Sequence, residues 1–255
     1  MTFGLSSRQL GAQVISAKIN GQELFYLSPL NSLASPARGG VPVLFPQFAE
    51  YGPLVKHGFV RNLPWTCIED LRSRHCHEQK FELTISPCAE SWPYSAELKL
   101  ESKVDGNSFY QMLTITNSGS NSFEWSGGLH PYFFVDNLLQ TRLIGLQSIP
   151  YKDRYSLGGY HRIEDFLFFD EEPCEKLFAS APSLKLVTNS TELIITTTGF
   201  AQWMVWNPGR KHSNLVDLPE GAWKSFVCIE PVNVSVPCKL EPGEVFTGTL
   251  RISLG

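Results

Sequence analysis

SAELKLESKVDGNSFYQMLTIT, residues 95–116, predicts two antiparallel strands joined by a tight turn. From Ser95 to Val104, apolar residues alternate with polar or charged ones, which is typical of a strand with one face in water. Asp105-Gly106 is a hairpin turn signal, and Phe109–Thr116 has the composition of the returning strand. This segment therefore predicts a fold built from antiparallel strands.

The same signals recur along most of the chain. Turn residues such as Asn-Gly, Asn-Pro-Gly and Pro-Gly separate the apolar runs. Further strands are expected at Gln13–Ile19, Glu23–Leu27, Lys80–Ile85, Arg142–Gln147, Leu184–Val187, Glu192–Thr197, Gln202–Trp206, Ser225–Ile229 and Val245–Ser253. The best helix candidate is a short one around Ile163–Phe169. Many short strands without a long helix predict an all-β fold, a large antiparallel β-sandwich. The absence of a linker or an internal repeat predicts a single domain over residues 1–255.

Composition narrows the classes of function. The chain has a net charge of −4 and no run of Lys or Arg longer than two. Nucleic acids and anionic membranes are bound by clustered cations, so neither is an expected partner. The first residues lack the pattern of a signal peptide, and no stretch is long and apolar enough to cross a membrane. We expect a cytoplasmic, monomeric protein whose partner is a small molecule.

The six cysteines lie at positions 67, 76, 88, 174, 228 and 238, without a C-x-x-C pair. A chain of this size can build a core without disulfides, so the thiols are expected to be reduced. His75-Cys76-His77 has residue types that bind metals. Neighbours in a strand point to opposite faces, however, and no second pair of ligands lies at a suitable spacing. No metal site is expected there.

Two long segments rich in Pro and Gly, at 29–65 and 207–224, interrupt the alternating pattern. Loops of this length in a compact domain usually serve a function. Their notable polar residues are Arg38, Lys56, His57 and Arg61 in the first and Asp217 in the second. Arg presents a planar fork to phosphate oxygens and Lys a point charge, so the first segment predicts a clamp for a small anion. Solvated surface charges are the alternative interpretation.

FEWSGGLHPYFFVDN, residues 123–137, places one histidine, His130, among aromatic and apolar side chains. Gly127 and Gly128 allow a bulge or the close approach of another backbone just before it. A strand bent at this pair would present an imidazole to an aromatic hollow, where it could act on a sugar ring. A buried structural histidine with a satisfied hydrogen bond is the alternative.

Glu230 ends the apolar run FVCIE and shares a strand face with Cys228 and Phe226, the face expected to point inward. Burying a carboxylate costs free energy unless the group is paired or used, and desolvation raises its pKa toward that of a general base. A structural ion pair with a nearby cation is the alternative. Together His130 and Glu230 form a candidate acid/base pair, and without a serine nucleophile elbow this pair favours proton transfer on a sugar over hydrolysis.

In these residues and in the motifs around them, the sequence resembles the aldose 1-epimerase superfamily, and within it the hexose-6-phosphate mutarotase branch. The motifs run in family order over nearly the whole chain, and HGFxRN together with VCxE is the most specific combination. The matching stretches are RGGVPVLFP (38–46), HGFVRNLPW (57–65), GLHPYF (128–133), VWNP (205–208), WKSFVCIEP (223–231) and LEPGE (240–244).

The resemblance implies a galactose-mutarotase-like supersandwich with the sugar in an open cleft and with no metal or organic cofactor. It implies His130 and Glu230 as the catalytic residues, which would face the anomeric centre from opposite sides of a shallow groove. In the implied mechanism Glu230 takes the proton of the O1 hydroxyl while His130 donates a proton to the ring oxygen. The implied sugar- and phosphate-binding residues are Arg38, His57, Arg61 and Asp217.

Two positions depart from the family pattern. Lys56 stands where the family often has Gln before HGF, and Glu175-Lys176-Leu177-Phe178 replaces an Asp-Arg-hydrophobic-Tyr stretch. Lys56 and Glu175 are therefore added to the predicted substrate-binding residues. The expected activity is the interconversion of the α and β anomers of a hexose 6-phosphate, with glucose 6-phosphate as the first candidate. A mutarotase of unphosphorylated aldoses and a non-catalytic carbohydrate-binding module are the alternatives.

Overall fold

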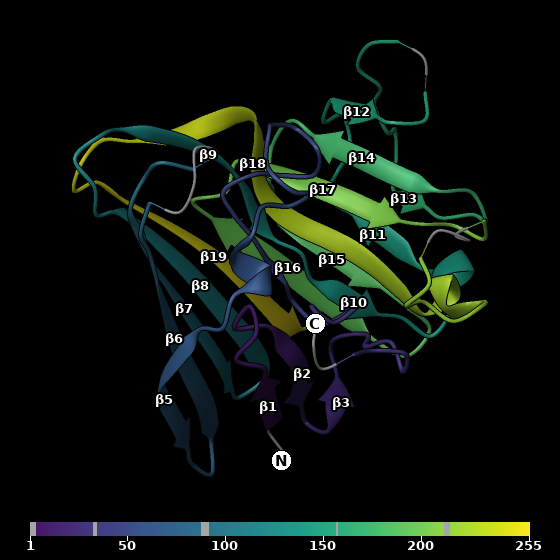
Figure 1. Ribbon diagram of the computed structural model, residues 1–255. Helices are drawn as coiled ribbons and strands as arrows, with labels where there is room; N and C mark the ends of the chain where they lie inside the picture. Colours follow the sequence, from purple (N-terminus) through teal and green to yellow (C-terminus); the bar gives the residue numbers. More distant parts are fainter. Residues whose placement is uncertain (1–3, 33–34, 88–91, 157, 212–214) are drawn as a thin grey trace.

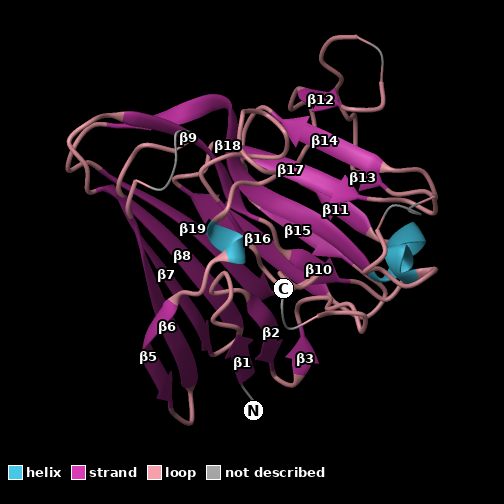
Figure 2. Cartoon of the chain, viewed as in Figure 1, coloured by secondary structure: helices cyan, strands magenta, loops and turns pink. Residues whose placement is uncertain are grey.

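The computed structural model describes residues 4–32, 35–87, 92–156, 158–211 and 215–255. Within these ranges the chain forms antiparallel strands and three short 3₁₀ helices (Figure 2). The helices are η1 (Val60–Asn62), η2 (Leu138–Gln140) and η3 (Ala222–Ser225). The expected all-β class is confirmed.

The strands form three sheets. The nine-stranded sheet has the order β13 (Leu167–Phe168), β11 (Arg142–Ile144), β15 (Leu184–Val187), β16 (Glu192–Thr198), β19 (Val245–Leu254), β8 (Ser108–Asn117), β7 (Ala96–Asp105), β6 (Cys76–Ile85) and β5 (Thr66–Arg72). The seven-stranded sheet has the order β12 (Tyr151–Asp153), β14 (Cys174–Phe178), β17 (Gln202–Asn207), β18 (Phe226–Leu240), β9 (Phe123–Leu129) and β4 (Val43–Leu44), and β10 (Tyr132–Phe134) also pairs with β18. The small sheet contains β1 (Gly4–Ser7), β2 (Val14–Ile19) and β3 (Gln22–Glu23).

The predicted hairpin is the β7–β8 pair, in which Leu100 lies opposite Leu113. Every second side chain of β7 is buried, so one face of this sheet lies against the core. Leu113 belongs to the same apolar cluster as Val227 and Ile229 of β18. The nine- and seven-stranded sheets therefore pack face to face, as the two layers of Figure 1 show, and the expected antiparallel sandwich is confirmed.

Three local predictions differ from the structure. The helix expected around Ile163–Phe169 is wrong, because this stretch contains the short strand β13. The strand expected to end at Ile229 continues as β18 to Leu240, since its second half pairs with β9. The edge strand β5 went unpredicted because its side chains are mostly exposed, so no apolar alternation marks it.

Parts of the two Pro- and Gly-rich segments lie on the outer face of the seven-stranded sheet, whereas the first segment also supplies β4 to that sheet and Val60 and Trp65 to the core between the sheets. Phe48 of the first segment belongs to one apolar cluster with Met204 of β17. Leu218 of the second segment clusters with Phe226 of β18. The parts of the two segments around Phe48 and Leu218 therefore cover this outer face on two sides. A cleft lies between these two covering segments.

The five described cysteines, 67, 76, 174, 228 and 238, are free thiols as predicted, whereas Cys88 lies outside the described residues. No metal site was expected at the His75-Cys76-His77 stretch. Both ring nitrogens of His77 have partners within the protein: Nδ1 accepts a hydrogen bond from the Leu5 N–H at 3.0 Å, and Nε2 lies 2.9 Å from Asp70. In the described ranges, no helix is long and apolar enough to cross a membrane.

Candidate active site

Strand pairing places His130 opposite Glu230. β9 pairs with the second half of β18, with Gly128 opposite Val232, and β10 continues the same register along the first half. His130 lies between β9 and β10 and Glu230 lies at the facing position of β18. Side chains directly opposite in an antiparallel pair project from one face of the sheet. The His130 Nε2 and Glu230 Oε1 atoms are accordingly 3.4 Å apart.

The prediction that these groups face a sugar from opposite sides of a groove is therefore wrong, because they are neighbours on one cleft wall. Both O1 and the ring oxygen of a pyranose are bonded to C1, so adjacent groups can reach both. Cys228 and Glu230 do share a face, as predicted. That face points to the cleft, whereas Val227 and Ile229 point into the core between the sheets.

Gly127 and Gly128 fix the backbone just before His130. Their φ angles are +148° and +154°. A Cβ atom on Gly127 would lie 2.0 Å from the Leu44 carbonyl oxygen, and one on Gly128 would lie 2.1 Å from the Pro231 carbonyl oxygen. Only glycine permits this close approach of three strands. The His130 N–H then donates to the Pro42 carbonyl at 2.9 Å, which ties the histidine to the first covering segment.

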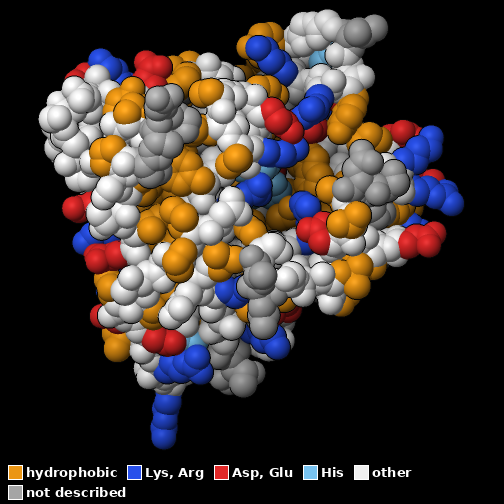
Figure 3. All heavy atoms as spheres, in the orientation of Figure 1, with side chains coloured by type: hydrophobic (Ala, Val, Ile, Leu, Met, Phe, Trp, Pro, Cys, Tyr) orange, Lys and Arg blue, Asp and Glu red, His pale blue; other side chains and the backbone are white. Residues whose placement is uncertain are grey.

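The register of the seven-stranded sheet also builds the floor of the cleft. Met204 of β17 lies opposite Glu230, and Trp206 lies opposite Cys228. The cleft has a volume of about 730 Å³ and opens to solvent. In Figure 3 it is a hollow where Lys and Arg side chains gather around histidine. Its lining residues are Arg38, Phe48, Ala49, Lys56, His57, Arg61, His130, Tyr132, Arg154, Glu175, Met204, Trp206, Leu215 and Glu230.

Both members of the central pair are buried, with side-chain exposures of 9% for His130 and 2% for Glu230. Burial raises the pKa of the Glu230 carboxyl well above its ordinary value of 4.5. Burial, together with His57, Arg61 and Arg38, lowers the pKa of His130 well below 6.5. Burial therefore favours the protonated carboxyl of Glu230 and the neutral imidazole of His130 in the free site.

Both residues also keep a free polar atom. Within the described chain, His130 Nδ1 and Glu230 Oε2 are buried without a hydrogen-bond partner. Buried polar groups in native proteins are usually satisfied, so such orphaned atoms point to a ligand or a proton-transfer role. The alternative interpretation of His130 as a satisfied core histidine therefore does not fit its surroundings.

His57 is a neutral donor beside this pair. Its ring lies 5.6 Å from the His130 ring in an edge-to-face contact. Its Nδ1 accepts the Ala49 N–H at 3.2 Å, which leaves the proton on Nε2. Burial, followed by the charges of Arg61, Lys56 and Arg38, lowers the pKa of His57 to about 3. His57 can therefore donate a hydrogen bond to a sugar hydroxyl but does not carry charge near neutral pH.

Arg38 is held between the two covering segments. Its Nε donates to both carboxylate oxygens of Asp217, at 3.1 and 3.2 Å, and its Nη1 donates to the Tyr132 hydroxyl at 3.2 Å. The Tyr132 ring stacks on His130, with 4.8 Å between ring centres and 10° between planes. Asp217 thus orients Arg38 from behind, and Tyr132 links Arg38 to the central pair.

Arg61 differs from the other cations of the cleft. Its Nη2 donates to the Lys56 carbonyl at 2.9 Å, and its Nε is buried without a partner. Across the described residues no carboxylate oxygen lies within 4.0 Å of its guanidinium, whereas Arg38 is paired with Asp217. Burial lowers the pKa of Arg61 from its ordinary value. A partly buried cation without a counter-charge is a site where a ligand anion binds with little competition.

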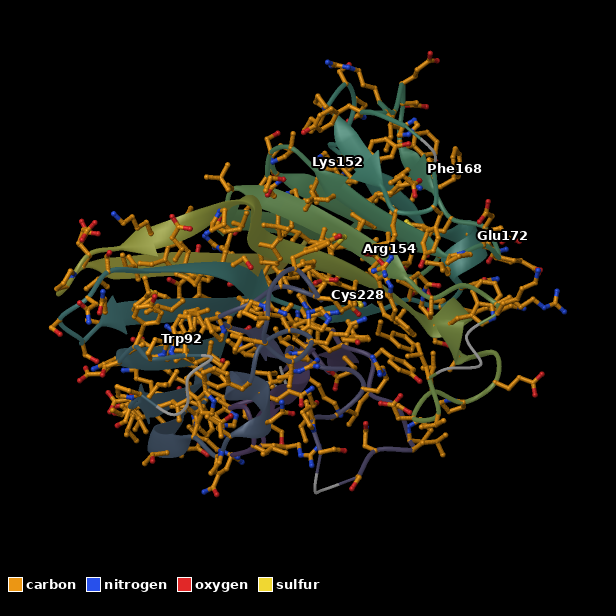
Figure 4. All side chains as sticks on the ribbon, turned by 45° about the horizontal axis from the view of Figure 1, so that its top comes forward. Trp92, Lys152, Arg154, Phe168, Glu172 and Cys228 are labelled. Atoms are coloured by element: carbon orange, nitrogen blue, oxygen red, sulfur yellow. The ribbon has the colours of Figure 1, made fainter. Side chains whose placement is uncertain are left out.

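The other predicted charges form an ion network at the rim. Lys56 pairs with Glu50 at 2.8 Å, and Glu175 pairs with Arg154 at 3.1 Å. The Arg154 guanidinium also lies 3.8 Å from Glu50, which connects the two pairs. Arg154 follows β12 and reaches toward the cleft from the end of that strand (Figure 4). Lys56 and Glu175 therefore line the cleft as predicted, but each has a counter-charge.

Sequence reasoning missed Tyr132, Trp206 and Arg154 as site residues. Tyr132 could have been found, because it lies two positions after His130 and so shares its strand face. Arg154 could not, because its place depends on the pairing of β12 with β14, and neither short strand shows an alternating pattern.

Three kinds of comparison with known proteins find relatives of this chain in sequence and in fold. Residues 4–253 match the sequence profile of a family described as aldose 1-epimerase. A Cenchrus ciliaris protein named "Putative glucose-6-phosphate 1-epimerase" is 30% identical over 95% of this chain and 79% of its own length. The fold matches a crystal structure of a "putative mutarotase" from Salmonella typhimurium with a TM-score of 0.88 at 24% identity, covering 98% of this chain and 86% of that one. It also matches a galactose mutarotase related enzyme from Lactobacillus acidophilus with a TM-score of 0.74 at 13% identity, covering 99% and 94%. The expected galactose-mutarotase-like fold is confirmed.

Proposed function

Because this chain belongs to the aldose 1-epimerase family, we propose that it interconverts the α and β anomers of a hexose 6-phosphate, most directly glucose 6-phosphate. The epimerase class follows from the family. The phosphorylated substrate is the finer proposal, and the name of the Cenchrus ciliaris relative supports it.

The observation that carries the phosphorylated substrate is the uncompensated charge of Arg61. The cleft holds four Arg and Lys side chains, and three of them have carboxylate partners in Asp217, Glu50 and Glu175. A neutral hexose would leave the fourth cation unpaired in a partly buried site, which costs free energy. A phosphate dianion would pair with it and could also accept from Arg38.

The reaction is a pair of proton transfers at the anomeric centre. Glu230 as carboxylate takes the proton of the O1 hydroxyl while protonated His130 donates to the ring oxygen, and the C1–ring oxygen bond breaks. This leaves the open-chain aldehyde beside protonated Glu230 and neutral His130. After rotation about the C1–C2 bond, the same transfers run backwards and close the ring on the other face of C1.

The resting protonation of the pair suits this route. Burial favours protonated Glu230 and neutral His130, which is the state that accompanies the open-chain intermediate. A site that is complementary to the reaction's high-energy species lowers the barrier. Binding of a cyclic sugar requires the proton to pass between the two groups, which are 3.4 Å apart.

Exchange NMR tests the proposed activity at equilibrium, without a pure anomer. We expect the wild-type protein to produce exchange cross-peaks between the α and β H1 signals of glucose 6-phosphate well above the spontaneous rate. Glucose and galactose serve as matched substrates without phosphate. Equal acceleration of the free and phosphorylated sugars would leave the epimerase class standing but overturn the phosphate preference, and no acceleration of any sugar would indicate a binding module.

The pH dependence of kcat/KM, which reports the groups of the free enzyme, tests the shared proton. The reaction needs one proton on the pair, so activity is lost when His130 is protonated while Glu230 is still protonated. Because the pKa of His130 is lowered, this acid limb is expected below pH 6.5. Because the pKa of Glu230 is raised, the alkaline limb of the profile is expected at a higher pH than an ordinary carboxyl would give. The kcat/KM for glucose 6-phosphate should therefore stay level through pH 6.5. An acid limb centred at or above 6.5 would contradict the buried, neutral histidine.

A further inference from the structure

Cys228 is a buried thiol that the proposed reaction does not use. It is fully buried on β18, between Tyr132 of β10 and Trp206 of β17 in the strand register (Figure 4). Its sulfur and the ligand atoms of His130 and Glu230 all lie within 4.8 Å of one another. Thiolate, imidazole and carboxylate are the three side-chain ligands that zinc takes in proteins.

We propose that Cys228, His130 and Glu230 bind a thiophilic divalent cation of the Zn²⁺ class, with a fourth position open to the cleft. Such a cation would coordinate both His130 and Glu230 and would therefore inhibit the epimerase reaction, a consequence that rests on the proposed function. The binding itself does not. The cation would be an inhibitor and not a cofactor, because the reaction needs both groups free to exchange protons.

Two observations at the site point to a ligand. His130 Nδ1 and Glu230 Oε2 are buried and unpartnered among the described residues, and both side chains line the cleft. A tetrahedral zinc site needs ligand atoms about 3–4 Å apart, given bond lengths of about 2.0–2.3 Å. The other two atoms, His130 Nε2 and Glu230 Oε1, are 3.4 Å apart and already fit this spacing. The three ligand atoms lie within 4.8 Å of one another, so the longest separation must shorten by about 1 Å, within reach of side-chain rotation.

Charge balance decides how tightly the ion is held. The Cys228 thiolate and the Glu230 carboxylate would together match the two positive charges of a bound Zn²⁺. Three of the four neighbouring cations have carboxylate partners, and among the described cleft residues the Arg61 charge is the one without such a partner to offset its repulsion of the ion.

Calorimetry with Zn²⁺ and absorption spectroscopy with Co²⁺ test the site on the reduced full-length protein in phosphate-free buffer. We expect one equivalent to bind and Co²⁺ to give a thiolate-to-metal charge-transfer band. Cys228→Ser should abolish the band and weaken Zn²⁺ binding by more than the roughly 10–100-fold that loss of an outer-shell partner costs. The matched control is Cys67→Ser, which removes an exposed thiol from β5.

The outcomes are separable from those of the epimerase assay. A band that survives in Cys228→Ser but disappears in Cys67→Ser would overturn the proposal in favour of a surface thiol. Absence of stoichiometric binding to the wild type would also overturn it. Either result would leave the anomer exchange unaffected. Conversely, a protein inactive on every sugar could still show the Cys228-dependent band.

Discussion

The Glu230→Gln variant is expected to exchange the anomers of glucose 6-phosphate about 10²–10⁴-fold more slowly than the wild type. Glutamine keeps the size and polarity of the side chain but cannot take the O1 proton. His130→Gln should lose activity to a similar degree, because the ring oxygen then has no proton donor. Exchange NMR at saturating substrate measures both losses as changes in kcat. Since the residues act as a pair on one proton, the double variant should be little slower than either single one.

Stability measurements separate this loss of catalysis from misfolding. The pKa of Glu230 is raised in the folded state above its ordinary 4.5, so its contribution to stability is fully present below pH 4.5 and is lost as pH rises toward the folded pKa. Glutamine has no such dependence. The thermal unfolding midpoint of Glu230→Gln, measured relative to that of the wild type, should therefore increase as the pH is raised. Glu97→Gln, an exposed change on β7, should alter neither activity nor this difference. Wild-type activity in Glu230→Gln would end the assignment.

The sandwich was predictable because its central strands follow simple burial rules. The β7–β8 hairpin alternates with period two and turns at Asp-Gly, so both signals agree over twenty positions. Strands that bury neither face in the ordinary way escaped prediction. The edge strand β5 is mostly exposed, and in β14 the charged residues Glu175 and Lys176 occupy half-buried positions. Neither strand therefore shows an alternation of apolar and polar residues.

The candidate site was predictable in its members but not in its geometry. His130 and Glu230 were found from an unusual residue type in an apolar run, and family motifs reinforced both. Their adjacency depends on the strand register, which cannot be read from a single sequence. It arises because β9 and β10 both pair with one long strand, β18, in the same register. Most ion pairs of the cleft likewise join segments far apart in the sequence, such as Arg38 with Asp217, although Lys56 and Glu50 are near neighbours. Only the folded chain reveals that Arg61 is the cleft cation for which the described residues offer no carboxylate partner.

The Arg61→Gln variant is expected to lose about 10–150-fold in kcat/KM for glucose 6-phosphate, which corresponds to the roughly 1.5–3 kcal/mol of a charge-assisted hydrogen bond. For free glucose the value should rise. The reason is that the Arg61 charge opposes protonation of His130, and a cyclic sugar needs that protonation. A bound phosphate dianion cancels the charge in the wild type, whereas glucose cannot. The two substrates should therefore respond to one substitution in opposite directions.

Two further variants show which property of Arg61 matters. Arg61→Lys keeps the charge without the planar fork and should recover part of the preference for phosphate. Arg74→Gln removes an exposed cation outside the cleft and controls for net charge. Parallel losses on glucose and glucose 6-phosphate in Arg61→Gln would mean that the residue only supports the segment around Lys56, to whose carbonyl it donates. Opposite responses would place the phosphate beside the buried acid/base pair, where its charge raises the pKa of His130 as it binds.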